Sequence, residues 1–143
     1  PIASVPAIIN DAVQADVGGA VVISAGGKEV GRRGREVEQA IAEAAQGSGL
    51  RIIGPNCLGI INSGNGLNAS FANRMPLPGK MAFISQSGAI CTAVLDLSLR
   101  EHIGFSYFIS LGSMLDVDFG DMIDLLLTIK LAARGVGWQH AIG

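Results

Sequence analysis

Short β-branched runs alternate along the chain with stretches whose apolar residues recur at helical spacing. Val37, Ile41 and Ala44, for example, lie at i, i+4 and i+7 and would share one face of a helix. The pattern predicts helices over 5–15, 34–46, 89–102 and 118–134, and strands over 18–27, 51–61, 81–85 and 105–112. Alternating strands and helices with short links are typical of parallel sheets flanked by helices and joined by right-handed crossovers. We therefore expect an α/β fold.

The stretch 62–80 breaks this alternation, because Asn, Gly and Pro dominate it. We interpret it as an irregular connector between two α/β units. The first unit begins in mid-pattern without an initiating strand, and each unit is small for a whole domain. The expected division is the later part of one domain over 1–62, a linker over 63–79, and the first part of another domain over 80–143.

Composition narrows the class of protein. The chain of 143 residues is 49% hydrophobic and 15% charged, which is too apolar for a disordered chain. Its formal charge of −2 argues against a general nucleic-acid surface. The longest apolar run, over 123–133, contains Lys130 and is shorter than the roughly 18 residues of a membrane span. No secretory leader is recognisable, so the expected location is the cytoplasm.

Polar residues gather where predicted strands end, and ligands of open α/β sheets bind at that edge. Ser85-Gln86-Ser87-Gly88 joins a strand to a helix. The first turn of a helix has unpaired N–H groups and partial positive charge, so an anion is favoured there. One serine would suffice as an N-cap. Both interpretations, a helix cap and a phosphate site, stay open on this motif alone.

The segment Gly54-Pro55-Asn56-Cys57 follows a short apolar strand and predicts a second helix start. Asn56 suits either an N-cap or a ligand contact. Two such helix starts that face each other would form one anion site. A helix N-terminus would also lower the pKa of the Cys57 thiol, but no partner side chain is placed to make it a nucleophile. We expect Cys57 and Cys91 to be buried, and their spacing predicts neither zinc nor a disulfide.

Three further groups of side chains admit two interpretations each. The basic cluster is expected to be a solvated loop rather than an anion site, and the acidic cluster to cap the last helix rather than bind a cation. The two histidines have no hydroxyl or carboxylate at a telling spacing, so no catalytic role is expected for them. In that order, the groups are Lys28, Arg32, Arg33 and Arg35; Asp116, Asp118 and Asp121; His102 and His140.

Several motifs taken together resemble one family. RIIGPNCLGIIN, LNASFA, PLPGKMAFISQSGAICTAVLD and GFSYFISLGSMLDVDFGD occur in the order seen in NDP-forming acyl-CoA synthetases. That superfamily includes ADP-forming acetate–CoA ligases, the succinyl-CoA synthetase alpha subunit and related fusions with a protein acetyltransferase. The resemblance runs from about Val5 to Asp124. It implies the later part of a Rossmann-like CoA-binding domain, followed by the start of a flavodoxin-like ligase domain.

The resemblance also implies roles for the polar motifs. In the family, two segments hold a phosphorylated histidine that passes its phosphoryl group to ADP or GDP. Here their phosphate-binding positions are Asn56, Cys57, Ser85, Gln86, Ser87 and Gly88. The positions near CoA are Ser24, Ala25, Gly26, Pro55 and Asn56, with Gly27 where relatives often carry an aromatic residue.

The resemblance implies a whole enzyme whose catalytic group and nucleotide site lie mostly outside these residues. The phosphohistidine would follow residue 143, so no catalytic residue and no turnover are expected from the isolated chain. The expected cofactors are CoA, ADP or ATP bound mostly outside this chain, and Mg²⁺ in the full enzyme, with no metal site here. The expected partners are CoA, an acyl phosphate and the remainder of the enzyme or a beta-type subunit, and a homo-oligomer is also expected.

Two alternatives to a ligase fragment remain open on the sequence. One is a non-catalytic module of a protein lysine acetyltransferase that senses CoA or phosphate. The other is a remnant without function. Residues 124–143 depart from the family pattern, and a shifted or truncated reading frame is one hypothesis for them.

Overall fold

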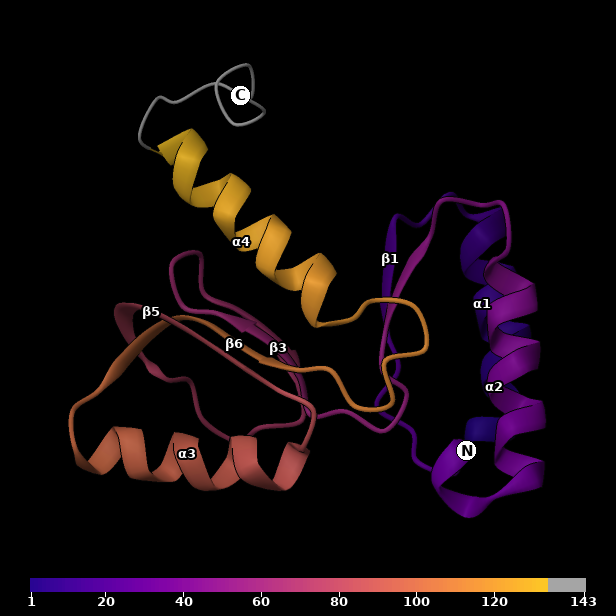
Figure 1. Ribbon diagram of the computed structural model, residues 1–143, viewed down its shortest axis with the longest axis horizontal. Coiled ribbons are helices and arrows are strands. Elements are labelled where there is room, and N and C mark those ends of the chain that lie inside the picture. The colour runs from indigo at the N-terminus through magenta and orange to yellow at the C-terminus, as the bar shows by residue number, and fades with distance from the viewer. Residues whose placement is uncertain (134–143) are drawn as a thin grey trace.

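The computed structural model describes residues 1–133, which form two lobes (Figure 1). The N-terminal lobe comprises residues 1–53 and contains a two-stranded parallel sheet, β1 paired with β2. Two longer helices and two short 3-10 helices accompany that sheet. In chain order the elements are η1 (Ile2–Ser4), α1 (Val5–Gln14), β1 (Gly19–Val21), η2 (Lys28–Val30), α2 (Arg32–Ala45) and β2 (Arg51–Ile53).

The C-terminal lobe, residues 59–133, contains a four-stranded sheet in the order β4-β3-β6-β5. β5 and β6 are parallel, whereas β3 runs antiparallel to both β4 and β6. Its elements are β3 (Gly59–Asn62), β4 (Leu67–Ser70), β5 (Leu77–Ser85), α3 (Gly88–Arg100), β6 (Gly104–Ser110) and α4 (Phe119–Ala133). Figure 1 shows α3 along one face of this sheet and α4 on its other side.

Each lobe has its own core because each helix turns one apolar stripe towards its sheet. In the N-terminal lobe, Ile9 of α1 and Ile41 of α2 pack with Ile52 of β2, and all three are at most 2% exposed. In the C-terminal lobe, Cys91 and Leu95 of α3 are buried against the sheet. A trio of aromatic rings, Phe83, Phe105 and Phe108, completes that second core.

Residues 111–117, which we call the strap, hold the two lobes together by hydrogen bonds. It runs antiparallel to the free edge of β2 and the turn after it. Ser113 N–H donates to Pro55 O at 2.8 Å, Leu115 N–H to Gly54 O at 3.0 Å and Val117 N–H to Ile52 O at 3.1 Å. The strap therefore covers a sheet edge that would otherwise be open, and a third apolar cluster lies beneath it. That cluster comprises Ile53, Cys57, Ile109, Leu111, Val117 and Met122.

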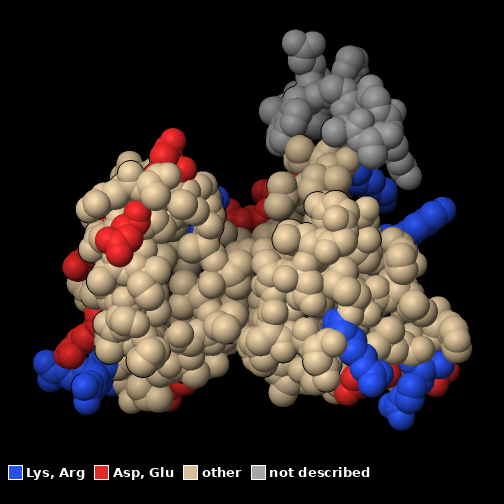
Figure 2. All heavy atoms as spheres, turned by 180° about the vertical axis from the view of Figure 1, so that it is seen from behind, with Lys and Arg blue, Asp and Glu red and all other residues tan. Residues whose placement is uncertain are grey.

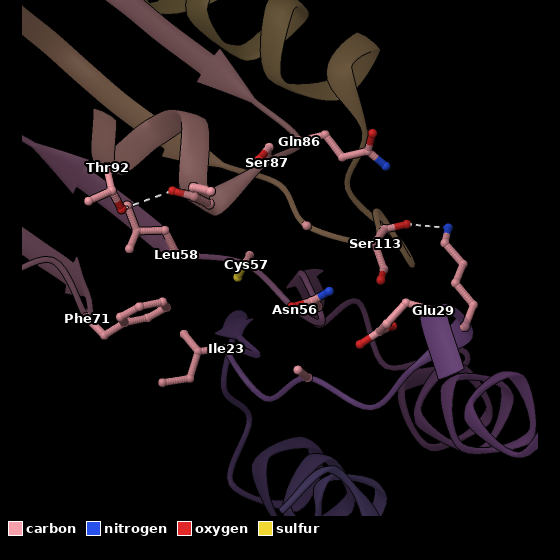
Figure 3. Close-up of a pocket in the computed structure, with 15 residues that line it drawn as sticks. Ile23, Glu29, Asn56, Cys57, Leu58, Phe71, Gln86, Ser87, Thr92 and Ser113 are labelled. Carbon is pink, nitrogen blue, oxygen red and sulfur yellow. Dashed lines mark hydrogen bonds between the residues drawn. The ribbon is translucent and has the colours of Figure 1, made fainter. Parts of the chain in front are cut away.

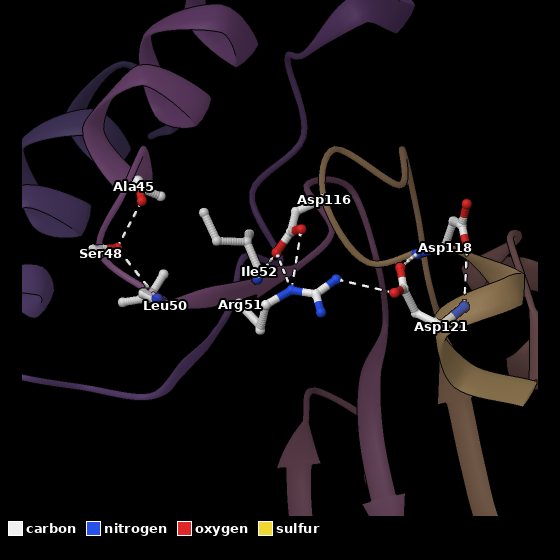
Figure 4. A network of polar contacts seen from close by, with 8 residues as sticks. All are labelled: Ala45, Ser48, Leu50, Arg51, Ile52, Asp116, Asp118 and Asp121. Atoms are coloured by element: carbon white, nitrogen blue, oxygen red, sulfur yellow. Dashed lines mark hydrogen bonds and ion pairs between the residues drawn. The ribbon is translucent and has the colours of Figure 1, made fainter. Parts of the chain in front are cut away.

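A polar network fixes the strap to the N-terminal lobe (Figure 4). The Asp116 carboxylate accepts the Ile52 N–H at 2.7 Å and pairs with Arg51 Nε at 3.0 Å. Arg51 Nη2 also lies 3.2 Å from Asp121 Oδ1. Asp118 and Asp121 exchange side-chain to backbone bonds, both 3.1 Å, at the start of α4. This is a capping box, so the helix-capping interpretation of Asp118 and Asp121 is confirmed.

The expected α/β class is confirmed, but three details differ. The interrupted strand 51–61 is two strands, β2 and β3, that belong to different sheets. The supposed irregular connector contains the second arm of a β-hairpin, β4, and β5 begins at Leu77 rather than Met81. Because β3 pairs antiparallel with β6, the second sheet is mixed. Among the described residues, no helix is long and apolar enough to cross a membrane.

Candidate functional site

A hollow of about 850 Å³ lies between the two lobes, next to the strap. Residues from both lobes line it, including Ile23, Lys28, Phe71 and Gly88 (Figure 3). Seen from behind, most charged side chains lie towards the outer ends of the lobes, and the surface between them is largely uncharged (Figure 2). Sites for small ligands are often clefts of this kind, apolar over most of their lining with a few polar groups.

The start of α3 forms one wall of the hollow. Ser87 is the N-cap, because its Oγ accepts the Ile90 N–H at 3.3 Å and its carbonyl accepts the Cys91 N–H at 3.0 Å. The intervening residues, Gly88 and Ala89, both line the hollow, and no partner for either N–H group is found among the described residues. These two N–H groups and the helix dipole favour a negatively charged ligand at this wall.

The two serines of this motif have different surroundings. Ser87 lines the hollow, whereas Ser85 does not. The Ser85 Oγ accepts the Ser87 N–H at 3.1 Å and so braces the turn that precedes the helix. Gln86 also lines the hollow and is exposed. Of the four predicted phosphate positions in this motif, three therefore face the hollow and one supports them from behind.

The predicted helix start at Asn56 is wrong. A cis Gly54–Pro55 peptide and a positive φ of 56° at Asn56 form a tight turn, after which the chain enters β3. The Asn56 N–H donates to Ser24 O at 3.0 Å. Asn56 still lines the hollow, so its amide side chain, rather than a second helix dipole, is what this segment offers a ligand.

Cys57 is 3% exposed, and its Sγ lies 3.3 Å from Val22 O. Burial raises the pKa of Cys57 to about 11. A thiol that stays protonated at neutral pH is a poor nucleophile, and Cys57 contacts the hollow as an apolar residue. Burial likewise raises the pKa of Cys91, which is 0% exposed. The prediction that both cysteines are buried is confirmed.

The opposite wall has one positive and one negative side chain. Lys28 Nζ donates to Ser113 O at 2.6 Å, a contact that joins η2 to the strap across the hollow. Glu29 Oε1 accepts the Gly26 N–H at 2.7 Å, and this bond lowers the pKa of Glu29. Since these two charges offset each other, the unpaired N–H groups of α3 decide which sign of ligand is favoured.

The basic cluster is therefore only partly a solvated loop. Arg32, Arg33 and Arg35 are solvated as expected, but they lie in the first turn of α2 and not in a loop, and Arg32 pairs with Glu36 four residues further on that helix. Lys28 does not fit the expectation, because its side chain reaches into the hollow. The available signal was that Lys28 directly follows the predicted strand 18–27, since ligands of α/β sheets gather where strands end.

Only some of the residues predicted to lie near CoA line the hollow. Ala25 lines the hollow, whereas Ser24, Gly26 and Pro55 do not. The backbone groups of the latter three are bonded to Asn56, Glu29 and Ser113, respectively. These three residues hold the shape of the wall that Ala25 and Asn56 present.

Gly27 has a steric explanation in this chain. A Cβ there would lie 2.1 Å from Glu38 Oε1, which accepts the Lys28 N–H at 2.9 Å. Glu38 is buried, with 6% of its surface exposed. The space that a larger side chain would need at position 27 is therefore filled by a carboxylate from α2.

The remaining candidates lie away from the hollow. His102 is exposed just beyond the last residue of α3, at the opposite end from Gly88. His140 lies outside the described residues. Asp116 binds Arg51 and the Ile52 N–H, a role that its sequence context did not indicate. Within residues 1–133, no group of three or more His, Cys, Asp or Glu could hold a metal ion.

Comparison with known proteins gives two family matches. Residues 1–63 match the CoA binding domain, and residues 78–131 match the succinyl-CoA ligase like flavodoxin domain. The chain is 44% identical over 126 residues to acetate–CoA ligase [ADP-forming] I of Archaeoglobus fulgidus, covering 88% of this chain and 18% of that protein. It is 46% identical over 110 residues to the acetate–CoA ligase [ADP-forming] II subunit alpha of Pyrococcus furiosus, covering 77% of this chain and 24% of the subunit.

Solved structures agree with these matches. A protein of Pyrococcus horikoshii OT3 superposes with a TM-score of 0.86 at 41% identity, over 90% of this chain and 29% of that one. A dinucleotide forming acetyl-coenzyme A synthetase 1 from Ca. Korarchaeum cryptofilum, in complex with phosphate and ADP, gives 0.82 at 39% identity, over 87% and 26% of the two chains. The fold and the two matched domains define an acyl-CoA synthetase architecture. The chain belongs to the NDP-forming acyl-CoA synthetase superfamily, and it spans between 18% and 24% of the two curated relatives named above.

Proposed function

We propose that this chain supplies part of the phosphate- and CoA-binding cleft of an NDP-forming acid–CoA ligase of the acetate–CoA ligase type. The observation that carries the proposal is the start of α3, where Gly88 and Ala89 line the hollow and no partner for their N–H groups is found among the described residues. Asn56 and Lys28 contribute an amide and an ammonium group to the same hollow. A phosphate needs several donors of this kind and no base.

Each proposed residue has its own part. Gly88 and Ala89 donate backbone N–H groups to the phosphate, and Asn56 and Gln86 donate side-chain amides. Ser87 caps α3, and Ser85 holds Ser87 in place. Cys57 closes the floor as an apolar residue. Ala25 and Asn56 present the wall along which CoA lies, and Ser24, Gly26 and Pro55 support that wall.

The proposal is tested by titrating the chain with inorganic phosphate and following the unfolding temperature. Binding to the folded state alone raises that temperature by mass action. Lys28→Met should weaken apparent phosphate affinity at least about tenfold, because a charge-assisted contact is worth roughly 1.5–3 kcal/mol. Arg32→Met is the matched control, since it removes an exposed cation of the same cluster that does not line the hollow. Equal phosphate responses in the two variants would contradict the proposal.

A second pair of variants separates binding from helix capping. Ser87→Ala removes the cap and should lower the free energy of unfolding by about 1 kcal/mol. Gly88→Ala leaves that cap intact, and its new Cβ meets nothing closer than Leu58 N at 3.6 Å. The methyl group crowds the wall where phosphate would lie. Gly88→Ala should therefore weaken the phosphate response without loss of stability, and an unchanged response would count against this placement.

The whole enzyme extends beyond these residues in the same proposal. A phosphorylated histidine, the nucleotide site and Mg²⁺ would come from the remainder of the protein or from a beta-type subunit. The described residues offer no ligand set for Mg²⁺, so no step through that ion is assigned to them. We expect no acetyl-CoA from acetate, CoA and ATP with this chain alone, and detectable product would overturn that expectation.

The organisation of the chain follows from the same proposal. We propose a CoA-binding part over 1–62, a connecting segment over 63–79 that contains β4, and a ligase part over 80–143, in a cytoplasmic protein. β4 and β5 are the outer strands of the second sheet, and such edges favour pairing with another chain. A homo-oligomer is therefore expected, and sedimentation measures it. The two curated relatives are ligases and the Ca. Korarchaeum cryptofilum protein is a synthetase, so these comparisons do not favour the acetyltransferase-associated sensor instead.

A further inference from the structure

The hollow has an apolar end that the phosphate proposal does not use. Figure 3 shows Phe71 and Ile23 at one end, with Glu29 and Ser113 at the other and Asn56 between them. Phe71 is 62% exposed and Ile23 48% exposed, and they come from different lobes. A large aromatic ring inside a concave site exposes apolar surface to water, and a ligand that covers the ring removes that surface from water.

The apolar end adjoins the proposed phosphate position. The Phe71 N–H donates to Leu58 O at 3.2 Å, which places the aromatic residue directly beside Leu58. On its other side, Leu58 N lies 3.6 Å from the point where a Cβ of Gly88 would stand. Leu58 thus separates the α3 N-terminus from Phe71 by one residue. A phosphate at Gly88 and a substituent of a few carbons over Phe71 can belong to one molecule.

The positions of the charged side chains in the hollow favour the same orientation of the ligand. Glu29 and Ser113 lie at the far end from Phe71, and Lys28 is bonded to Ser113 there. Ile23, Leu58 and Phe71 carry no charge or hydrogen-bonding side chain. An apolar substituent turned towards Glu29 would remove water from a carboxylate that has one hydrogen bond, to the Gly26 N–H, and taking a charge out of water is costly. Turned towards Phe71, it meets an aromatic face and a branched aliphatic side chain.

We propose that Phe71 and Ile23 form a subsite for the apolar substituent of an organic phosphate whose phosphate group lies at the start of α3. The inference rests on the proposed function and deepens it, because it assigns the acyl chain of an acyl phosphate to this end. It implies a ligand with a substituent larger than a methyl group, since a methyl would leave most of the Phe71 ring uncovered.

The test compares inorganic phosphate with phenyl phosphate, a stable probe that adds one apolar ring to the same anion. Apparent dissociation constants come from the dependence of unfolding temperature on ligand concentration. We expect phenyl phosphate to bind about tenfold more tightly than phosphate, the gain typical of covering one ring with an aromatic partner. Phenol alone, without the anion, should bind far more weakly than phenyl phosphate.

Variants decide whether the gain arises at this subsite. Phe71→Ala should bring phenyl phosphate down to the affinity of phosphate, Ile23→Ala should lower it in part, and Phe71→Leu should restore some of it. Leu67→Ala is the matched control, because Leu67 is 48% exposed at the start of β4, the strand that Phe71 follows, and does not line the hollow. Since Phe71 is largely exposed, its removal leaves both cores intact, and phosphate affinity should not change.

The outcomes of these measurements distinguish the apolar subsite from the proposed phosphate site. Stabilisation by phosphate with no gain from the phenyl ring overturns the subsite and leaves the phosphate site standing. A gain that survives Phe71→Ala, or one that Leu67→Ala abolishes equally, also overturns the subsite. Failure of both anions to stabilise the chain overturns the inference and the proposed function together.

Discussion

Replacing Asp116 by alanine should release the strap from the N-terminal lobe. The Asp116 carboxylate accepts the Ile52 N–H at 2.7 Å, and Ile52 is only 1% exposed. A buried N–H group that loses its acceptor costs about 1–3 kcal/mol. The ion pair with Arg51 adds little, roughly 0.2–1 kcal/mol, because the two side chains are 34% and 52% exposed. The expected loss in the free energy of unfolding is about 2 kcal/mol.

Asp116→Asn is the control that separates these two contributions. Its amide oxygen can still accept the Ile52 N–H, so only the ion pair and the charge of the acceptor are lost. We expect a loss below about 1 kcal/mol for this variant. Urea unfolding curves measure both changes, and with a slope of about 2 kcal/mol per molar the midpoint of Asp116→Ala should fall by about 1 M. Equal losses in the two variants would refute the reasoning, because the ion pair would then account for the whole effect.

Three further predictions concern packing, thiol reactivity and acid. Gly34→Ala would place a Cβ 1.6 Å from Gly27 O, so a loss of at least about 2 kcal/mol is expected in thermal unfolding. Burial raises the pKa of Cys57 to about 11, so iodoacetamide at pH 8 should label it in urea-unfolded chain and spare it in folded chain. The Asp118 N–H lowers the pKa of Asp121 from 3.8, so its contribution is present above that pH and is lost as pH falls through the lower folded value. Asp121→Asn should therefore weaken the fall in stability below pH 4, and an unchanged acid curve would contradict this assignment.

Local patterns predicted the helices well, because their apolar spacing depends only on neighbours along the chain. The predicted helix 89–102 corresponds to α3 over Gly88–Arg100, with Ser87 as its cap. The same local logic failed at Asn56, where the residue type suits a cap but the backbone turns into a strand instead. A capping residue indicates a break in the chain, and the element after the break depends on which sheet the next strand joins.

The turn after β3 and the strand β4, which were predicted as irregular chain, had a local signal of their own. Asn65-Gly66 lies between two runs of strand-forming residues, and Gly66 has a positive φ of 74°. An Asn-Gly pair in this setting is a strong hairpin signal. The abundance of Asn, Gly and Pro in this stretch favours an irregular connector, whereas the order of Asn and Gly between two strands favours the hairpin.

The candidate site was predictable only in part. Ser87, Gly88 and Asn56 were identified, because strand ends of α/β sheets gather polar residues and ligands. Lys28 and Phe71 were not assigned to the site, since each reaches it through contacts with residues distant in sequence. The strap was not predicted either, because its backbone bonds to Ile52, Gly54 and Pro55 do not depend on residue type, and the partners of Asp116 lie more than 60 positions away in the sequence.

The strap also sets an order of events in folding. Ile52 and Asp116 are 64 positions apart, so the bond between them closes one of the larger loops in the chain. During synthesis the N-terminal lobe emerges first, and its β2 edge has no partner until the strap has been made. Long-range pairings of this kind slow folding and leave strand edges exposed to other chains meanwhile. The free edge of β2 is therefore covered only after every strand of the second lobe has been made, though before α4.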